Sequence, residues 1–292
     1  MAKARVLERR RRTIQNIRKI TRTMELISTA QFKRAMNRAG AAGAFARQLN
    51  VLRSRLAGSA LYIRHPLLQP PPERKRTTLL VLSSNRGLCG GYNAAVVRLA
   101  LTRHEELHTA GQEVRLEVVG KRGFSAFRHR RIPVAESFTH FTYRPAFAEV
   151  DVLAVRYLDD YLHGLAHCLE VVFTPFRGAT PQAPTMATLL PLSGFSEAES
   201  RADADRNRFE FLPAAEELCR RLLPTVFKFH LYQCFLEAAA AEQLARMTAM
   251  KAATENADEM IARLSVAYNR ARQGQITGEL LEIIGGAEAI NE

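Results

Sequence analysis

The stretch with the clearest capacity for chemistry is "SSNRGLCGGYN", from Ser83 to Asn93. It follows an apolar run typical of a buried strand and precedes a helical pattern, which is where α/β proteins place phosphate-binding loops. However, it is not G-x-G-x-x-G, and it lacks the G-K-[ST] ending of a nucleotide P-loop. We interpret it as a tight strand-to-helix turn whose glycines permit close packing. Nucleotide binding, with Arg86 holding the anion, is the alternative.

Other residues that could do chemistry do not gather into a site. His104 and His108 share a helical face at i, i+4, but no third metal ligand accompanies them. Asp159 and Asp160 are adjacent, so on a helix they point to different faces and do not form an acid–base pair. No serine or cysteine nucleophile motif is present. We therefore expect no catalytic residue, no metal site and no cofactor.

The cysteines predict reduced thiols rather than disulfides. They are Cys89, Cys168, Cys219 and Cys234, and no two of them form a C-x-x-C pair. Cys219 and Cys234 are expected on one helix, where fifteen residues span ~22 Å, which is beyond disulfide reach. This pattern indicates a reducing compartment.

Strands alternate with helices in the middle of the chain, which predicts an α/β layer domain over residues 74–193. The apolar run "TTLLVLSS" at residues 77–84 is typical of a strand that is buried on both faces. Further strands are predicted at residues 114–120, 168–176 and 185–192, and helices at residues 93–109 and 146–164. The charged stretch at residues 194–208 is predicted to lack regular structure.

The first segment, residues 1–64, is predicted to be one long helix. Residues 3–58 contain no proline and the first glycine is Gly40, so a helix of about 55 residues, ~80 Å long, is expected. This length exceeds the width of a single domain, so the helix must project or lie along a partner helix. Its apolar or small residues recur three and four positions apart. They are Ile14, Ile17, Thr21, Met24 and Ser28.

The last segment, residues 209–292, is predicted to be helical almost to its end, with a kink or a junction between two helices at Pro224. A seam with heptad spacing runs through it. Its members are Met247, Met250, Thr254, Ala257, Ile261, Leu264, Tyr268 and Ala271. Because the α/β domain connects the two long helices at one end, we expect them to pair antiparallel. The predicted fold is therefore α/β: a long antiparallel coiled coil of the N- and C-terminal helices with an inserted Rossmann-like domain.

The positive charge of the chain is concentrated in one element. The formal net charge is +13, yet residues 1–64 hold sixteen Lys and Arg against only Glu8 and Glu25, which gives this segment +14. The run from Arg9 to Arg12 encircles the helix, so no orientation buries it without a large desolvation cost. An acidic partner is therefore expected for this helix, and nucleic acid, anionic lipid or an acidic protein surface would each fit.

No targeting or membrane-spanning segment is expected. The sequence has no stretch of 18 apolar residues. The N-terminus, "MAKARVLERRRR", lacks the apolar core of a secretory signal. The helical pattern is already under way by about residue 5, which leaves no room for an organellar transit peptide.

Four motifs resemble the gamma subunit of the F-type ATP synthases. They are "KITRTMELIS" at residues 19–28, "NRGLCGGYN" at 85–93, "RMTAMKAATENA" at 246–257 and "ITGELLEIIGGAEAI" at 276–290. The resemblance covers both terminal helices and the first strand and turn, whereas residues 120–210 match only in the order of strands and helices. In this family the paired terminal helices form a rotor shaft inside a ring of three alpha and three beta subunits.

The resemblance implies a function without an active site in this chain. The chain would be the central-stalk rotor subunit, which couples ion flow through the membrane sector to conformational change at catalytic sites on the beta subunits. Its partners would be the alpha and beta subunits, the epsilon subunit and the membrane c-ring, with no nucleic acid and no bound nucleotide. It would lie as a peripheral protein at the cytoplasmic face of the bacterial inner membrane.

The family motifs carry individual residues over as expected partner contacts. Met24 matches a methionine near the acidic loop of the beta subunit, and Arg246 matches an arginine of the same torque region. Gln273 and Thr277 match polar contacts toward the tip of the shaft. Arg9 and Arg10, with the other arginines of the first helix, are expected to face the acidic surface.

The closing apolar residues are expected to form the tip of the shaft in its bearing. They include Ile276, Leu280, Leu281, Ile283 and Ile284. Two positions depart from the family pattern. Asn85 stands where an aspartate is usual, which argues against a contact there that depends on a negative charge. Leu281 replaces a common threonine, which weakens a hydrogen-bonding role at that position.

Two other classes of function stay open from the residues alone. A basic coiled-coil protein that binds nucleic acid would explain the charge of residues 1–64, although that segment has few aromatic residues. A Rossmann-type enzyme would bind nucleotide as an isolated chain. Salt-dependent binding of nucleic acid would indicate the first class and calorimetry with nucleotide the second, whereas a shaft would co-purify with large nucleotide-binding subunits.

Overall fold

The computed structural model describes residues 2–57, 65–69, 71, 74–176, 178, 183–192 and 215–291. Within these ranges the side chains of residues 2–3, 44–57, 215–216, 218–219, 282 and 285–291 are not described. The chain divides into two compact units. Unit 1 comprises Met1–Ser28 with Arg246–Glu292, and unit 2 comprises Thr29–Ala245. The stretch predicted to lack regular structure, residues 194–208, lies outside the described residues.

Two long helices confirm the predicted terminal helices. They are α1, Ala2–Ala57, and α6, Ala215–Asn291. Pro224 lies inside α6, so the predicted alternative of a junction between two helices is wrong. A proline in a helix interior costs about 3 kcal/mol. The side chains of Leu223, Val226 and Phe227 around it are fully buried. Each burial stabilises the fold by about 1.5–3 kcal/mol, so the three together outweigh the cost of the proline.

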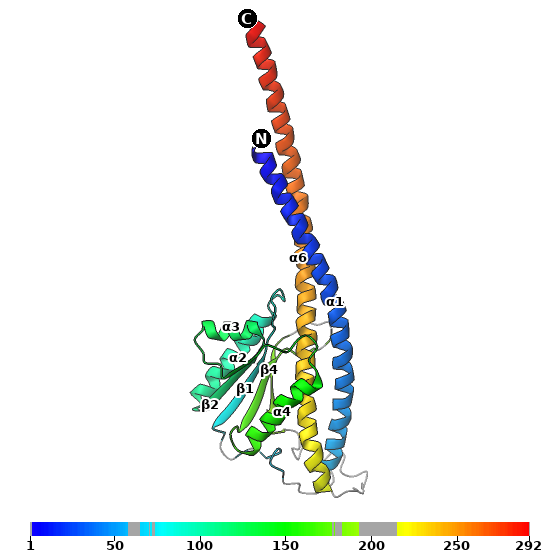
Figure 1. The fold of residues 1–292 in the computed structure, drawn as a ribbon, viewed down its shortest axis with the longest axis vertical. Helices are drawn as coiled ribbons and strands as arrows, with labels where there is room; N and C mark the ends of the chain where they lie inside the picture. Colours follow the sequence, from blue (N-terminus) through cyan, green and yellow to red (C-terminus); the bar gives the residue numbers. More distant parts are fainter. Residues whose placement is uncertain are drawn as a thin grey trace. The chain divides into compact units, whose positions relative to one another are not determined.

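Unit 2 contains a five-stranded sheet in the order β3-β2-β1-β4-β5. Figure 1 labels the three central strands, β2, β1 and β4. The strands are β1 Arg76–Leu82, β2 Glu113–Val119, β3 Glu136–Phe138, β4 Cys168–Phe173 and β5 Thr185–Leu190. Strands β3, β2, β1 and β4 pair in parallel, and β5 pairs antiparallel to β4. This mostly parallel sheet confirms the predicted Rossmann-like α/β fold.

Helices cover both faces of the sheet. They are α2 Tyr92–Thr109, α3 Lys121–His129 and α4 Phe147–Leu162, joined by the unit 2 part of α6. Leu80 and Leu82 of β1 pack in the core beneath α4 and α6, while Leu79 and Val81 pack in the core beneath α2 and α3. Because successive side chains of a strand point to opposite faces, β1 supplies both cores and reads as a continuous apolar run.

Two elements of unit 2 escaped the sequence prediction, namely α3 and β3. Strand β3 has only three residues, too few for an alternating pattern. Helix α3 contains Gly123, which disfavours a helix in the sequence pattern. In the structure the backbone N–H of Gly123 donates to Ser83 Oγ at 2.9 Å, and a Cβ there would collide with the Ser83 side chain. The glycine is therefore required by the close approach of α3 to the end of β1.

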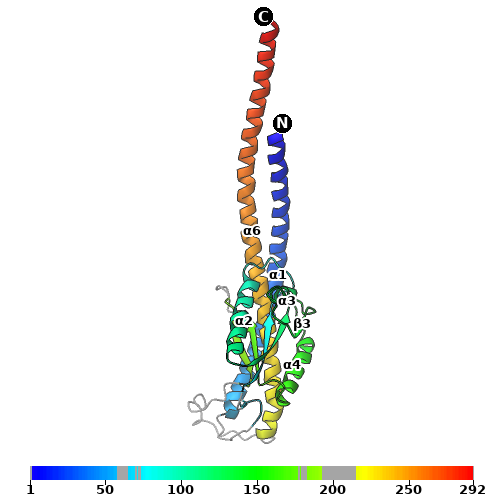
Figure 2. The same ribbon diagram turned by 90° about the vertical axis from the view of Figure 1, so that its left-hand side faces the viewer.

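In unit 1 the first part of α1 and the last part of α6 lie side by side and antiparallel, and α6 continues past the start of α1 (Figures 1 and 2). The predicted α6 seam is confirmed, because all of its eight members are buried or half-buried. Positions on the outer face, such as Met260 and Val266, are 48% and 70% exposed. The antiparallel pairing expected from the sequence is therefore present.

The α1 seam differs from its prediction at one position. Ile17, placed in the seam by its spacing, is 44% exposed. Arg18, whose side chain is 50% exposed, forms an ion pair with Asp258 of α6 at the edge of the seam. Both registers keep steps of three and four, so spacing alone could not choose between them. The long apolar stem of an arginine can lie in a seam while its charged end reaches the rim.

Candidate functional site

The centre of unit 1 is a pair of buried threonines. Thr21 Oγ1 of α1 and Thr254 Oγ1 of α6 lie 2.9 Å apart, and their residues are 8% and 7% exposed. Thr254 Oγ1 is also 2.8 Å from the Met250 carbonyl oxygen, and Thr21 Oγ1 is 3.1 Å from the Arg18 carbonyl oxygen. One hydroxyl can donate to the other, which donates in turn to its own helix. Both hydroxyls are satisfied without water, so this pair fixes the register of the two helices.

Two contacts continue the seam toward the chain ends. Arg18 pairs with Asp258, and the Arg11 guanidinium lies over the Tyr268 ring, 5.2 Å from its centroid. As residue numbers fall along α1 they rise along α6, as an antiparallel pair requires. The seam thus combines these polar and cationic contacts with buried or half-buried apolar members such as Met250, Ile261 and Leu264.

The structure places the predicted contact residues on different kinds of surface. Arg9 and Arg10 are exposed. Met24, three residues after Thr21, is half-buried. Gln273 and Thr277 are exposed one turn apart on α6, where Thr277 Oγ1 donates to the Gln273 carbonyl oxygen at 3.0 Å. Five of the six predicted residues are therefore at least partly accessible.

Arg246 is the exception among the predicted contact residues, because it is only 7% exposed. It lies at the start of the α6 part of unit 1. A guanidinium covered this well by its own chain can present little surface to another subunit. Its assignment as a partner contact stays a prediction.

The last described turns of α6 carry an apolar surface that its own chain leaves open. Ile276 is 48% exposed, Leu280 54%, Leu281 64%, Ile283 68% and Ile284 56%. Five large aliphatic side chains within nine residues make a contiguous apolar surface of a kind that soluble proteins cover with a partner. The apolar character predicted for this end is thus on the outside of the helix.

The turn after β1 confirms the interpretation of Ser83–Asn93 as a strand-to-helix connection. Asn85 ties it to two other segments: its Nδ2 donates to the carbonyl oxygens of Thr139 and Phe141 at 3.1 and 2.6 Å, and its Oδ1 accepts from Lys121 N at 3.1 Å. Leu88 adopts a left-handed φ of 64° and is 59% exposed. The turn therefore holds these segments together and exposes an apolar residue, Leu88, at its tip.

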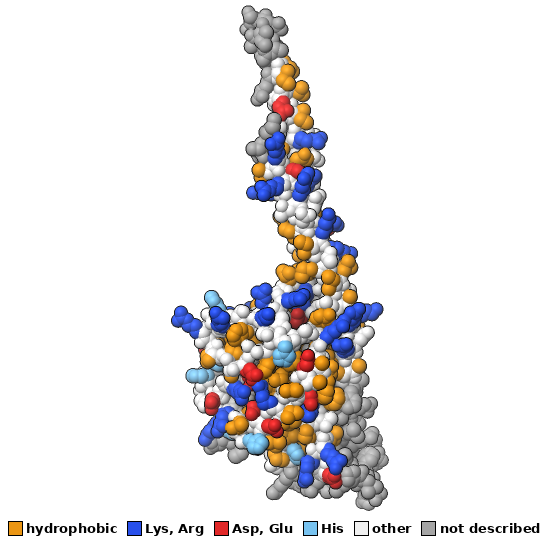
Figure 3. Space-filling model, viewed as in Figure 1, with side chains coloured by type: hydrophobic (Ala, Val, Ile, Leu, Met, Phe, Trp, Pro, Cys, Tyr) orange, Lys and Arg blue, Asp and Glu red, His pale blue; other side chains and the backbone are white. Residues whose placement is uncertain are grey.

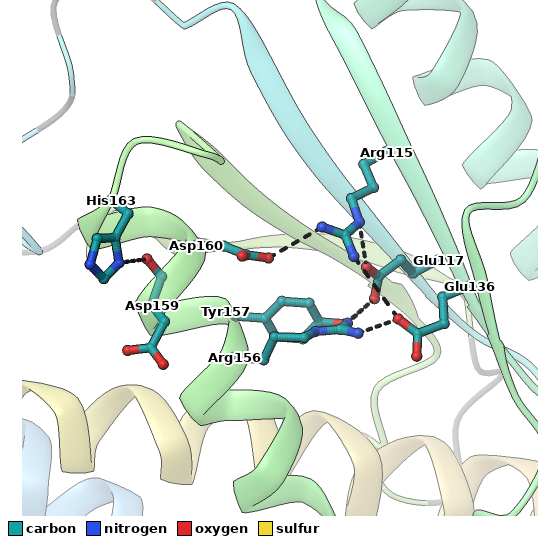
Figure 4. Close-up of polar contacts among 8 residues, drawn as sticks. All are labelled: Arg115, Glu117, Glu136, Arg156, Tyr157, Asp159, Asp160 and His163. Atoms are coloured by element: carbon teal, nitrogen blue, oxygen red, sulfur yellow. Dashed lines mark hydrogen bonds and ion pairs between the residues drawn. The ribbon is translucent and has the colours of Figure 1, made fainter.

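A charged cluster joins α4 to the edge of the sheet (Figure 4). Glu117 of β2 is fully buried and accepts from Arg156 Nη2 and from Tyr157 Oη, the latter at 2.7 Å. Arg156 also reaches Glu136 of β3. Burial and the adjacent Glu117 carboxylate raise the pKa of Tyr157 well above its usual value. The phenol therefore stays protonated and keeps donating to Glu117.

Arg115 of β2 closes the same cluster from the solvent side. Its Nε lies 2.9 Å from Glu117 Oε1, and its Nη1 donates to Asp160 at 3.3 Å. Asp159 points away from the cluster, as Figure 4 shows, so the two adjacent aspartates do not form an acid–base pair, as predicted. The cluster has ion pairs on all sides and holds β3 against α4.

A second buried glutamate on the other face of the sheet has its own arginine. Glu170 of β4 is 3% exposed and receives Arg103 of α2 through two parallel bonds, Nε to Oε2 and Nη2 to Oε1, each 2.7 Å. This hydrogen bonding raises the pKa of Arg103 above its usual value. The pair fixes α2 on the sheet and offers no vacant group for catalysis.

The described cysteine side chains are free thiols, and His104 and His108 of α2 contact each other. The His104 and His108 rings stack with centroids 6.5 Å apart, and the described residues contain no group of three or more metal-ligating side chains. Cys219 and Cys234 share α6, as expected. Cys168 is buried, and burial raises the pKa of its thiol to about 11. Cys89 and Cys234 are buried as free thiols as well.

Comparison with known proteins agrees with this architecture. The ATP synthase family matches residues 3–290. An ATP synthase gamma chain of Rhodopirellula baltica is 49% identical over 294 aligned residues that cover 99% of both chains, and one of Leptospira biflexa is 36% identical over the whole of both. A chain in the cryo-EM structure of Euglena gracilis mitochondrial ATP synthase superimposes with a TM-score of 0.65, at 17% identity over 98% of this chain and 94% of that one.

The chain therefore belongs to the ATP synthase gamma-chain family. It is a non-catalytic subunit of the central stalk, and catalysis lies in the beta subunits. The alternative interpretation as a Rossmann-type enzyme is therefore wrong, and the family match gives no support to nucleic-acid binding. The chain is associated with the membrane through the complex. None of the described helices combines the length and the hydropathy needed to cross a bilayer.

Proposed function

We propose that unit 1 of this chain is the part that turns inside a ring of alpha and beta subunits and carries work through its surface. The segments 1–64 and 209–292 would form the shaft. Segment 74–193 would lie outside the ring and bind the epsilon subunit and the c-ring, at the cytoplasmic face of a bacterial inner membrane. Rotation of an asymmetric shaft would impose a different state on each of the three beta subunits.

The observation that carries this proposal is the apolar outer surface of residues 276–284. These side chains are exposed in the chain itself and need a cover from other subunits. An apolar bearing suits a turning part, because apolar contacts are non-directional and do not favour one angle. Hydrogen bonds and ion pairs would hold preferred angles, and within this stretch the predicted polar contact Thr277 already bonds to its own helix.

The proposed contacts lie at different levels along unit 1. Gln273 and Thr277 would contact the ring near the tip, and Arg9 and Arg10 would face acidic residues of the ring. Met24 and Arg246 would belong to the torque-bearing level. Met24 is half-buried, so a partner would touch one side of it while α6 supports the other.

The substitution Met24→Lys tests the torque-bearing level. The lysine adds a cation at a half-buried position that the proposal places against charged groups of a beta subunit. We expect assembly to be retained and proton pumping to fall at least threefold relative to ATP hydrolysis, both measured on the same membranes. Thr23→Lys adds the same charge at an exposed neighbouring position and is expected to keep the ratio. An unchanged ratio in Met24→Lys would refute the proposed role.

A further inference from the structure

Two histidines near the end of α2 have ring nitrogens that the fold leaves uncommitted. His104 and His108 are four residues apart, and their rings contact each other with centroids 6.5 Å apart and planes inclined by 21°. His104 is half-buried and His108 is exposed. Within the described residues, neither ring forms a hydrogen bond or an ion pair with another group. The pair therefore presents nitrogen lone pairs that are available to an outside ligand.

Other histidines of unit 2 use a ring nitrogen to hold the fold. His167 Nδ1 accepts from two backbone N–H groups at the start of β1, at 3.1 and 3.3 Å. His65 Nδ1 accepts from Leu67 N at 3.2 Å. A ligand that bound either of these nitrogens would break an existing hydrogen bond. A ligand at His104 and His108 would break none, which sets this pair apart.

The charges around the pair favour a cation. Glu105, which follows His104 in the sequence, is exposed and forms no ion pair with a side chain that the structure describes. Arg103, which precedes it, is held by the buried Glu170. His108 lies in the last turn of α2, where the carbonyl end of the helix dipole stabilises positive charge. This turn therefore combines a free carboxylate with a favourable dipole.

The spacing of the two histidines suits a transition metal ion. Side chains four residues apart lie on one face of a helix with Cβ atoms ~5–6 Å apart, so both imidazoles can reach a single ion. Zn–N bonds of ~2.0–2.1 Å require the two ligating nitrogens to lie within ~4 Å of each other. Because His108 is exposed, rotation of its ring meets this requirement without moving the backbone. Imidazole ligands suit Zn²⁺, Ni²⁺ and Cu²⁺, whereas Mg²⁺ and Ca²⁺ prefer oxygen.

We propose that His104 and His108 form a reversible binding site for a divalent transition metal ion, which clamps the last turn of α2. The two imidazoles supply the protein ligands, water completes the coordination shell, and Glu105 contributes its charge. The described residues contain no group of three metal-ligating side chains, so the ion is held at two points and exchanges with solvent. The site lies in unit 2 and does not depend on the shaft contacts proposed above.

Calorimetry with Ni²⁺ and with Zn²⁺, on the full-length chain without an affinity tag, measures the binding. We expect His104→Asn and His108→Asn each to weaken it at least tenfold, because one remaining imidazole cannot chelate. Histidine side chains also reach the surface elsewhere on unit 2, as Figure 3 shows, so His129→Asn serves as the control at another exposed histidine. It should change the affinity less than twofold. Unchanged binding in His104→Asn, or no binding to the unaltered chain, would overturn the proposal.

A second variant tests the spacing of the histidines and not their number. Thr109→His/His108→Asn keeps two histidines on α2 but places them five residues apart, ~140° around the helix, where they cannot share an ion. Thr109 is exposed, so the substitution disturbs no core contact. We expect this variant to bind Ni²⁺ as weakly as His108→Asn, within twofold. Binding as tight as that of the unaltered chain would show that chelation plays no part.

Two further measurements test the ligands and the clamp. X-ray absorption at the zinc edge should show two imidazole nitrogens among the ligands, whereas sulfur ligation would place the ion at a cysteine and contradict the proposal. An ion joined to both side chains holds the helical turn between them, so hydrogen exchange of the amides of residues 108–112 should slow at least fivefold when Zn²⁺ is added. The His104→Asn variant should show no such slowing. Equal slowing in both proteins would mean that the ion acts elsewhere.

Discussion

The hydroxyl oxygens of Thr21 and Thr254 lie 2.9 Å apart although their residues are 233 positions apart in the chain. Each is buried, and each also contacts a backbone carbonyl of its own helix. A polar pair in a helical seam fixes register at a cost in apolar burial. The threonine pair therefore fixes the alignment of the two helices, while apolar seam members such as Met250 and Leu264 supply burial.

The Arg156–Glu117 pair is predicted to be the main electrostatic support of the sheet edge. Arg156→Met should leave the fully buried Glu117 carboxylate with Arg115 and Tyr157 alone. We expect the free energy of unfolding to fall by about 3 kcal/mol, the lower end for a broken buried pair. Urea unfolding followed by circular dichroism measures it.

The control for that prediction lies in the same cluster. Arg115 is 45% exposed, so Arg115→Met should cost no more than about 1 kcal/mol. Adding Glu117→Met to Arg156→Met should restore much of the loss, because no unpaired buried charge remains. Equal losses for Arg115→Met and Arg156→Met would contradict this assignment.

Tyr157 is predicted to make stability fall with alkaline pH. Its folded pKa is raised above the unfolded value near 10, chiefly by burial and next by Glu117. The folded state therefore retains a proton that the unfolded chain loses, so this contribution is complete below about pH 10 and declines above it. The free energy of unfolding should fall less steeply in Tyr157→Phe than in the unaltered chain between pH 9 and 11. Parallel pH profiles would count against the assignment.

The stability of the turn after β1 is predicted to depend on the side-chain amide of Asn85. Its Nδ2 donates to two carbonyl oxygens, which a carboxylate at the same place would repel. Asn85→Asp should cost about 1–3 kcal/mol at neutral pH, more than Asn85→Ala, which adds no charge. Urea midpoints of the two variants decide the point, and an aspartate variant more stable than the alanine variant would show that the turn tolerates a charge.

The long helices and the α6 seam could be predicted because they depend on local periodicity. Glycine and proline are sparse at both ends, and heptad spacing is visible in the sequence. The α1 seam was harder to predict, because Ile17 and Arg18 both satisfy the spacing. Choosing between them requires knowledge of where Asp258 lies on the partner helix, which is a tertiary contact.

The buried ion pairs left a partial signal in the sequence. Glu170 interrupts the apolar run "CLEVV" and Glu117 precedes two valines in "RLEVV", and a buried carboxylate requires a cation. The partners Arg156 and Arg103 could not be named, because the packing of α4 and α2 on the sheet selects them.

The pairing of α1 with α6 can be tested in the assembled complex with a disulfide between Thr21→Cys and Thr254→Cys. We expect mild oxidation to join the two helices, as peptide mapping would confirm. ATP hydrolysis and proton pumping should stay within twofold, because the paired helices turn together. Thr21→Cys/Val266→Cys, twelve residues further along α6 at ~18 Å, should not crosslink. If the first pair failed to join, or if both activities were lost and a reductant restored them, α1 and α6 would not turn as one paired unit.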